Sequence, residues 1–278
     1  MRELSLAFGP GDELLGTVCL PDRLADAAPG VLLFNAGMLH RIGPHRVQVK
    51  LARNLAERGV ASLRFDMHGL GDSARASGQL PLAAQMQEDL RAALDALGRE
   101  AGVDTFAVFG FCSGIEPSFR LAQADARVRV LALYDGFDLM NGLSRIRYYL
   151  RRLRQHGVGR VGWAHYARRA RLLWGELLVR LRDRDGQALD AADEALSVTR
   201  LLQGMGRLAA DGARVTLIHA GSAFGVRDGQ AQMRAALDRH GARQVHAVFL
   251  DQVDHLVTSS AAQQAFIAAV GDALAPSV

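Results

Sequence analysis

The sequence predicts an α/β protein with a mostly parallel sheet that is flanked by helices and interrupted by one helical insertion. Short apolar runs typical of buried strands alternate with amphipathic helices before residue 138 and again after residue 206. Residues 138–206 are instead rich in arginine, follow a helical period and contain no strand candidate. A chain of 278 residues is long for one domain and short for two, so we expect one core with an insertion.

The first strand candidate is the continuous apolar run 31–34, which reads as a buried parallel strand followed by a loop. A helix is predicted over 47–58 because apolar residues recur at every fourth position, and Gly59 ends it. The next strand covers 60–65, and the glycine-containing loop 66–73 follows it.

Helix and strand patterns then alternate up to the insertion. Residues 82–97 form a helix with one apolar face, 105–109 a strand, 113–124 a helix and 128–134 a strand. Alternation at these spacings is typical of βαβ units, which build a parallel sheet.

The alternation resumes after the insertion, with strands over 215–219 and 245–250 and helices over 230–239 and 261–274. We therefore predict a core built from residues 1–137 and 207–278, and an Arg-rich helical lid insertion over residues 138–206 that covers the sheet it interrupts.

Cysteine content and hydropathy favour a cytoplasmic protein. The two cysteines, Cys19 and Cys112, are too few for a disulfide framework and too far apart for a metal or redox motif. The N-terminus lacks a basic region followed by an apolar run, and no apolar stretch approaches the roughly 18 residues of a membrane span. We therefore expect neither secretion by an ordinary signal peptide nor a transmembrane segment.

The segment Gly110-Phe111-Cys112-Ser113-Gly114 joins a predicted strand directly to a predicted helix. So sharp a turn holds its central residue in a strained conformation, and it needs flanking glycines because a Cβ would clash there. Cys112 is therefore the candidate nucleophile. Ser113 comes one position late for this spacing, and its backbone N–H is a candidate donor to an oxyanion.

These features resemble the α/β-hydrolase superfamily over nearly the whole chain. The segment from Phe65 to Ser73 resembles the R-x-D-x-x-G-x-G-x-S motif that follows the family's fourth strand, and Asn35-Ala36-Gly37-Met38 lies where its oxyanion loop would be. The resemblance implies an α/β-hydrolase fold with a helical lid, and it makes the Met38 N–H the second oxyanion donor.

Two branches of the superfamily share features with this chain. The cysteine in the elbow resembles dienelactone hydrolase. The run that contains His40, Arg41, Gly43, His45 and Arg46 is similar to bacterial serine-aminopeptidase-like and exosortase-associated hydrolases.

The general base of this fold follows the last strand, where the sequence has His255. The chain order of nucleophile, insertion and histidine is the order that the fold requires. His219 and His246 are weaker candidates for the base. His40 and His45 lie in the oxyanion loop and are candidate contacts for substrate.

The third member of the expected triad departs from the family pattern. The family's acid normally follows the strand that ends here at His219, but the aspartate position holds Ala223 or a neighbour. A variant of the fold takes its acid from the end of the preceding strand, where this chain has Asp135. The other acids that stay open are Asp228, Asp251 and Asp254. A thiol depends less on the acid than a hydroxyl does, because a Cys/His pair can form a thiolate and an imidazolium by itself.

The leading functional hypothesis is an acyl hydrolase, a thioesterase or esterase, that works through an acyl-Cys112 intermediate with His255 as general base. No metal or cofactor is implied. An acyltransferase or condensing enzyme that uses the same acyl-cysteine is the alternative. The missing acid at Ala223 motivates a third hypothesis, a non-catalytic binding protein of the same fold.

The net charge is +4, and the basic character belongs to one segment: residues 138–200 hold thirteen Arg against seven Asp and Glu. Two interpretations of these arginines stay open, a solvated face of the lid helices or a surface for an acyl donor carried on coenzyme A, a phosphopantetheine arm or an acidic carrier protein. Neither nucleic acid nor a membrane is an expected partner. The predicted apolar lining for an acyl chain consists of Trp163, Tyr166, Leu172, Leu173 and Trp174.

Overall fold

The structure of the protein is a computed structural model, and it describes residues 1–76, 78–136, 198–221 and 226–275. The chain divides into two compact units, one formed by Met1–Asp138 with Leu201–Val278 and the other by Leu139–Arg200. The sequence placed the end of the insertion at residue 206, whereas the structure groups residues from Leu201 onward with the first unit. The predicted lid itself falls almost wholly outside the described residues.

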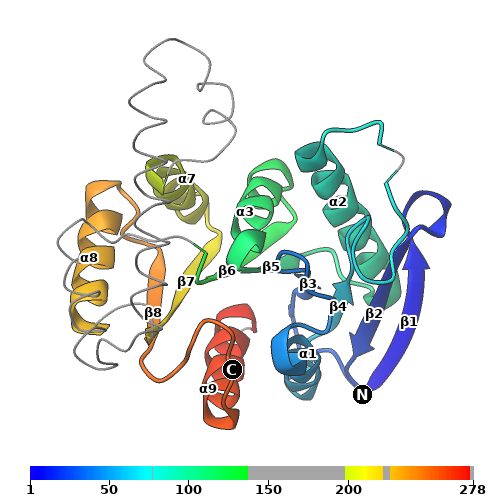
Figure 1. Cartoon of the computed structure of the whole chain (residues 1–278), viewed down its shortest axis with the longest axis horizontal. Coiled ribbons are helices and arrows are strands. Elements are labelled where there is room, and N and C mark those ends of the chain that lie inside the picture. Colours follow the sequence, from blue (N-terminus) through cyan, green and yellow to red (C-terminus); the bar gives the residue numbers. More distant parts are fainter. Residues whose placement is uncertain (77, 137–197, 222–225, 276–278) are drawn as a thin grey trace, which may run out of the picture. The chain divides into compact units, whose positions relative to one another are not determined.

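In the described residues, eight strands form one sheet in the order β1-β2-β4-β3-β5-β6-β7-β8 (Figure 1). The strands are β1 Arg2–Phe8, β2 Leu14–Leu20, β3 Gly30–Phe34, β4 Ser62–Phe65, β5 Phe106–Phe111, β6 Val128–Tyr134, β7 Arg214–Ala220 and β8 His246–Leu250. The β1/β2 and β2/β4 pairs are antiparallel and all other pairs are parallel. The predicted mostly parallel sheet is confirmed.

Helices cover both faces of the sheet, with α1 and α9 on one face and α2 and α3 on the other (Figure 1). The described helices are α1 Val47–Glu57, α2 Leu82–Ala101, α3 Ile115–Ala124, α7 Val198–Ala210, α8 Val226–Arg239 and α9 Ser260–Leu274, with short 3-10 turns at η1 Pro10–Asp12, η2 Pro44–Arg46 and η3 Cys112–Gly114. None of these described helices has both the length and the apolar composition that crossing a membrane requires.

The central strands are buried on both faces, as helices on both sides of the sheet require. Every residue of β3 and of β5 is buried, and both strands are almost entirely apolar. The carboxyl ends of these parallel strands lie along one edge of the sheet, which is where open α/β sheets bind their ligands.

Each predicted strand and helix that falls among the described residues forms, with ends that differ by a few residues. The N-terminal hairpin of β1 and β2 was not predicted. Its signal is the alternation of Leu4, Leu6 and Phe8 before a turn that contains Gly9 and Gly11, a pattern typical of an antiparallel edge strand.

Helix α7 packs closely on α3 through a glycine. A Cβ added at Gly204 would overlap the ring of Phe119, which is 1% exposed and has no space into which to move. Through this contact α7 packs on α3, the helix that in turn packs on β5.

We expect Gly204→Ala to lower the free energy of unfolding by about 1–2 kcal/mol. Alanine in a helix interior normally adds up to about 1 kcal/mol, but overpacking against a buried ring costs about 1–3 kcal/mol. Urea unfolding followed by circular dichroism measures the change. The exposed neighbour Gln203→Ala serves as the control and should stay within about 0.5 kcal/mol. A Gly204→Ala variant more stable than the natural chain would contradict this packing.

Candidate active site

Cys112 sits at the turn between β5 and α3 in a strained backbone conformation. Its φ is 51°, in the left-handed region that residues with a Cβ seldom adopt. The turn needs Gly110 because a Cβ there would lie 2.8 Å from both the carbonyl oxygen of Gly114 and the hydroxyl of Ser118. The predicted strand–Cys–helix elbow therefore forms, and it presents a partly exposed thiol at the carboxyl edge of the sheet.

Asp135 and His255 meet at the same edge. Asp135 follows the last residue of β6, and His255 lies in the loop between β8 and α9. His255 Nδ1 is 2.6 Å from Asp135 Oδ2. The carboxylate is 9% exposed and the imidazole 42% exposed, so the hydrogen bond is shielded on the acid's side and open on the side of the second ring nitrogen. Asp135, one of the four acids that the sequence left open, is thus in contact with His255; the Asp228 side chain is not among those that the structure describes.

Electrostatic coupling links this pair to Cys112. The hydrogen bond with Asp135, followed by the hydrogen bond with Cys112, raises the pKa of His255 to about 10 against the opposing effect of burial. The same contact with His255 is the largest cause that lowers the pKa of the Cys112 thiol. Cys112 and His255 therefore favour the thiolate and imidazolium forms.

Aromatic side chains hold the imidazole of His255 in place. The ring of Tyr134 stacks on it with centroids 6.4 Å apart and an interplanar angle of 20°, and Phe111 approaches edge-on at 5.9 Å. The Tyr134 hydroxyl donates to the Asp254 carbonyl oxygen at 3.0 Å, so the residue before His255 is tied to the sheet. Such packing restricts the ring to the orientation that contacts Asp135.

Backbone strain is concentrated around these residues. Cys112, Asp135 and Val257 all have positive φ, at 51°, 53° and 55°. Val257 is fully buried two residues after His255, and a β-branched residue rarely adopts this conformation. Strain of this kind persists only where the surrounding structure enforces it, and it gathers at functional sites.

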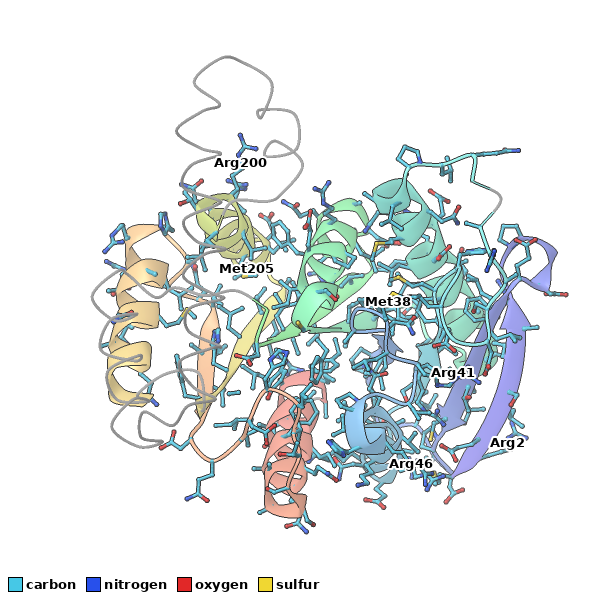
Figure 2. All side chains as sticks on the ribbon, viewed as in Figure 1. Arg2, Met38, Arg41, Arg46, Arg200 and Met205 are labelled. Atoms are coloured by element: carbon cyan, nitrogen blue, oxygen red, sulfur yellow. The ribbon has the colours of Figure 1, made fainter. Side chains whose placement is uncertain are left out.

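The loop after β3 is fastened to the elbow by the Ser113 side chain. The Gly37 N–H donates to Ser113 Oγ at 2.7 Å, and the Ser113 backbone N–H contributes to the lowered pKa of the Cys112 thiol. Met38 follows in the same loop with its side chain 87% exposed (Figure 2). Sequence reasoning considered only the backbone of Ser113 and missed the fastening by its hydroxyl.

The fully buried Asp66 anchors the loop after β3. Its Oδ1 accepts from Arg41 N–H at 2.7 Å and from Asn35 Nδ2 at 2.8 Å, and its Oδ2 accepts from the Arg41 guanidinium and from the Asp72 N–H. Asn35 Oδ1 in turn accepts from the Met67 N–H at 2.7 Å. The loops after β3 and β4 thus share one polar network with a buried carboxylate at its centre.

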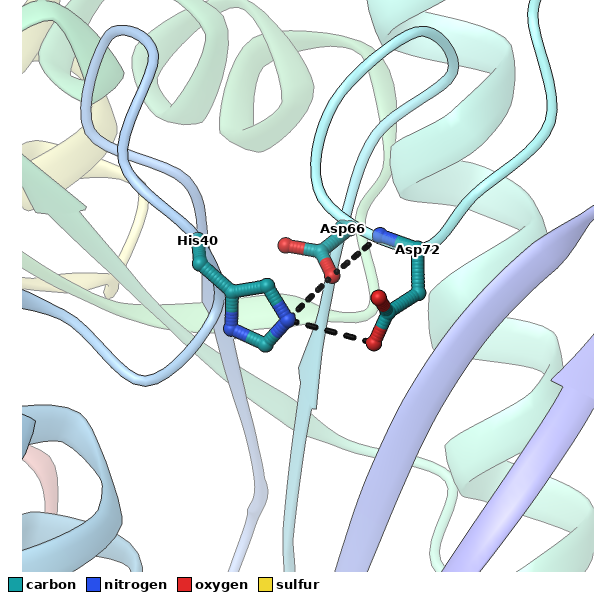
Figure 3. Close-up of side chains that lie close together, drawn as sticks. All are labelled: His40, Asp66 and Asp72. Atoms are coloured by element: carbon teal, nitrogen blue, oxygen red, sulfur yellow. Dashed lines mark hydrogen bonds and ion pairs between the residues drawn. The ribbon is translucent and has the colours of Figure 1, made fainter.

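His40 belongs to this network. Its Nε2 lies 3.2 Å from Asp72 Oδ2 and 3.4 Å from Asp66 Oδ2 (Figure 3). The three side chains have the composition of a cation site, but the Arg41 guanidinium already contacts both carboxylates. Arg41 thus supplies the positive charge that the carboxylates require, and we assign no metal to them.

The remaining predicted residues lie apart from the Cys112–His255 pair or outside the described residues. His45 is exposed, with a φ of 50° in the turn before α1. Of the other acids, Asp254 accepts from the Leu256 and Thr258 N–H groups of its own loop, and Asp251 is exposed. Trp163, Tyr166 and Ala223 lie outside the described residues.

No family model and no curated protein matches the chain. Solved structures do. A dienelactone hydrolase from Anabaena variabilis matches 98% of this chain and 96% of its own at TM-score 0.56 and 14% identity. The α/β hydrolase GrgF from Penicillium matches 98% and 97% at TM-score 0.56 and 16% identity. The esterase domain of a Rhodothermus marinus protein matches 97% and 96% at TM-score 0.54 and 17% identity. These likenesses confirm the predicted α/β-hydrolase fold.

The network at Asp66 predicts different costs for two glycines of one loop. Gly69 and Gly71 both have positive φ, but a Cβ at Gly71 would overlap the Asp66 carboxylate, whereas a Cβ at Gly69 meets open space. We expect Gly69→Ala to lower the free energy of unfolding by about 1 kcal/mol and Gly71→Ala by about 3 kcal/mol, measured by urea unfolding. Equal losses would show that Asp66 does not approach the Gly71 backbone.

Proposed function

We propose that the protein is an acyl hydrolase, a thioesterase or esterase, in which Cys112 is the nucleophile, His255 the general base and Asp135 the acid that orients it. The observation that carries the proposal is the 2.6 Å contact between His255 Nδ1 and Asp135 Oδ2, on an imidazole whose interaction with Cys112 lowers the pKa of the thiol. A nucleophile, a base and an orienting acid in contact are the minimal machinery of acyl transfer through a covalent intermediate.

The proposed reaction begins when the Cys112 sulfur attacks the acyl carbonyl carbon. The carbonyl oxygen becomes an oxyanion that accepts from the Ser113 and Met38 N–H groups, each worth about 3 kcal/mol of transition-state stabilisation. His255 gives its proton to the leaving thiol or alcohol as the bond to the acyl carbon breaks. His255 then takes a proton from water, the hydroxide attacks the acyl-cysteine, and the free acid and the thiolate are released with the proton retained on His255.

The choice of a thiol nucleophile favours thioesters and activated esters as substrates. Transfer of an acyl group from one sulfur to another is nearly thermoneutral, whereas transfer from an amide to sulfur is uphill. The surplus of positive charge in residues 138–200 supports a donor attached to an anionic carrier, such as coenzyme A or a phosphopantetheine arm. Structural likeness to proteins named as an esterase and a dienelactone hydrolase supports hydrolysis as the outcome.

We expect incubation with short and medium acyl thioesters to add one acyl mass to the protein, mapped to Cys112, and to release free acid. Intact-mass spectrometry should detect the adduct most readily in His255→Ala, because water is then not activated for deacylation. Cys112→Ala should abolish the adduct. Cys19→Ala is the matched control, because that thiol is fully buried outside the site, and it should load normally.

Three results of this experiment are informative. Loading at Cys112 with release of a coupled product instead of free acid would make the protein an acyltransferase. No loading by any thioester or ester would contradict the enzymatic proposal and favour a binding protein of this fold. Loading that persists in Cys112→Ala would place the nucleophile elsewhere.

The coupling of Cys112 to His255 and Asp135 predicts the pH dependence of alkylation. Because its pKa is lowered, Cys112 should remain a thiolate to lower pH than an ordinary thiol, whose pKa is near 8.5. Its rate with iodoacetamide should fall only as pH drops through that lowered pKa, and should not fall as His255 loses its proton near pH 10.

In Asp135→Asn the alkylation rate at a pH below the natural midpoint should drop about tenfold, because an uncharged partner stabilises the imidazolium less. Asparagine tolerates the positive φ of this position, so the variant should fold. Peptide mapping separates the alkylation of Cys112 from that of Cys19, and a single-exponential fit to the Cys112 time course gives the rate. An Asp135→Asn profile that coincides with that of the natural chain would remove Asp135 from the proposed triad.

A further inference from the structure

A second histidine faces the acid of the proposed triad from the neighbouring strand. His219 lies near the end of β7, is 2% exposed, and places its Nδ1 3.9 Å from Asp135 Oδ1. Its ring stacks on Phe249 of β8, with centroids 5.2 Å apart and an interplanar angle of 24°. Because β6 and β7 are paired in parallel, the ends of the two strands lie side by side and bring His219 to Asp135.

The two oxygens of Asp135 therefore have different surroundings. Oδ2 faces His255 at 2.6 Å, and Oδ1 faces the end of β7, where it accepts from the Ala220 N–H at 3.4 Å. The Asp135 N–H also donates to the Ile218 carbonyl oxygen at 3.0 Å. Backbone and side chain of the acid are thus both tied to the last residues of β7, on the side away from the nucleophile.

We propose that His219 is a positioning residue whose Nδ1–H faces Asp135 Oδ1 across 3.9 Å and attracts that oxygen, so that the carboxylate is held with Oδ2 aimed at His255. The inference rests on the proposed function, since it concerns the acid of that triad. His219 has no role of its own in the reaction. It positions Asp135. The Asp135 carboxylate stabilises the His255 imidazolium, and the imidazolium stabilises the Cys112 thiolate.

The chemical need for such a residue follows from the burial of Asp135. A buried carboxylate is stable as an anion only when both of its oxygens have donors, and a 9% exposed acid receives little help from water. Burial would raise the pKa of Asp135, yet the contact with His219, followed by that with His255, lowers it to about 2. Without His219, Oδ1 would keep only the long 3.4 Å contact from the Ala220 N–H, and the carboxylate would be held less firmly against rotation about its last bond.

Among the described residues, few other polar side chains are placed to interact with Asp135 Oδ1. The elements packed around His219 contribute Phe249 from β8, which carries no charge, and Tyr134 and Asp135 from β6 and its end. The titratable groups on the far side of the carboxylate are His255 and Cys112, which belong to the proposed triad.

The test compares His219→Phe with His219→Asn. Phenylalanine keeps a ring against Phe249 and removes both nitrogens, whereas the asparagine amide nitrogen takes nearly the place of Nδ1. His246→Phe is the matched control, because His246 is an exposed histidine on the adjacent strand. The readout is the rate of Cys112 alkylation by iodoacetamide as a function of pH, which a residue that only fills space would not move.

We expect the midpoint of the alkylation profile to rise by about one pH unit in His219→Phe, to return toward the natural value in His219→Asn, and to stay unchanged in His246→Phe. The midpoint rises because a weaker charge on Asp135 stabilises less of the His255 imidazolium, which in turn stabilises less of the thiolate. A His219→Phe profile equal to the natural one would overturn the inference while leaving the triad intact.

Failure of the proposed function gives a different result. In that case the natural chain itself would show the profile of an ordinary thiol, before any variant is compared. If His219→Phe does not fold, nitrogen-15 NMR of the natural chain decides, since the inference requires a proton on His219 Nδ1. An unprotonated Nδ1 at neutral pH would overturn it.

Discussion

The carboxyl ends of β5, β6 and β7 lie next to one another, and the loop after β8 returns to the same edge of the sheet, so that His255 Nδ1 lies 2.6 Å from Asp135 Oδ2. The rest of the site depends on this contact. Together with His219, it keeps the buried carboxylate charged. It also raises the pKa of His255 to about 10 and through His255 lowers the pKa of Cys112. Without the acid, the His255 imidazolium would be stabilised by Cys112 alone.

The surrounding fold holds that contact at a cost in backbone conformation. Positive φ at Cys112, Asp135 and Val257 is maintained by strands and helices that are buried on both faces of the sheet. A separate polar network centred on Asp66 fixes the loop after β3, and Ser113 Oγ joins this loop to the elbow. Rigid strands thus position Cys112 and Asp135, the proposed nucleophile and acid, and the fastened loop after β3 carries the proposed oxyanion donor Met38.

Much of this arrangement could be predicted from the sequence because its signals are local. The glycines around Cys112 identify the elbow, and chain order after the last strand identifies His255. For the acid, the sequence could provide only a set of candidates. The choice of Asp135 among them depends on the pairing of β6 with β7, which no local sequence pattern encodes. The position of His219 beside it has the same tertiary origin. The edge strand β1 and its neighbour β2 were not predicted because the alternation of apolar and polar residues in them is weak.

The most direct test of this account is the protonation state of His255, measured by nitrogen-15 NMR of the imidazole rings with His255→Gln used to assign its signals. The account predicts that both ring nitrogens of His255 carry protons at neutral pH and that the ring loses its proton near pH 10, well above the ordinary value of 6.5. A neutral ring at neutral pH, titrating near the ordinary histidine value, would contradict the claim that Asp135 and Cys112 hold His255 as an imidazolium.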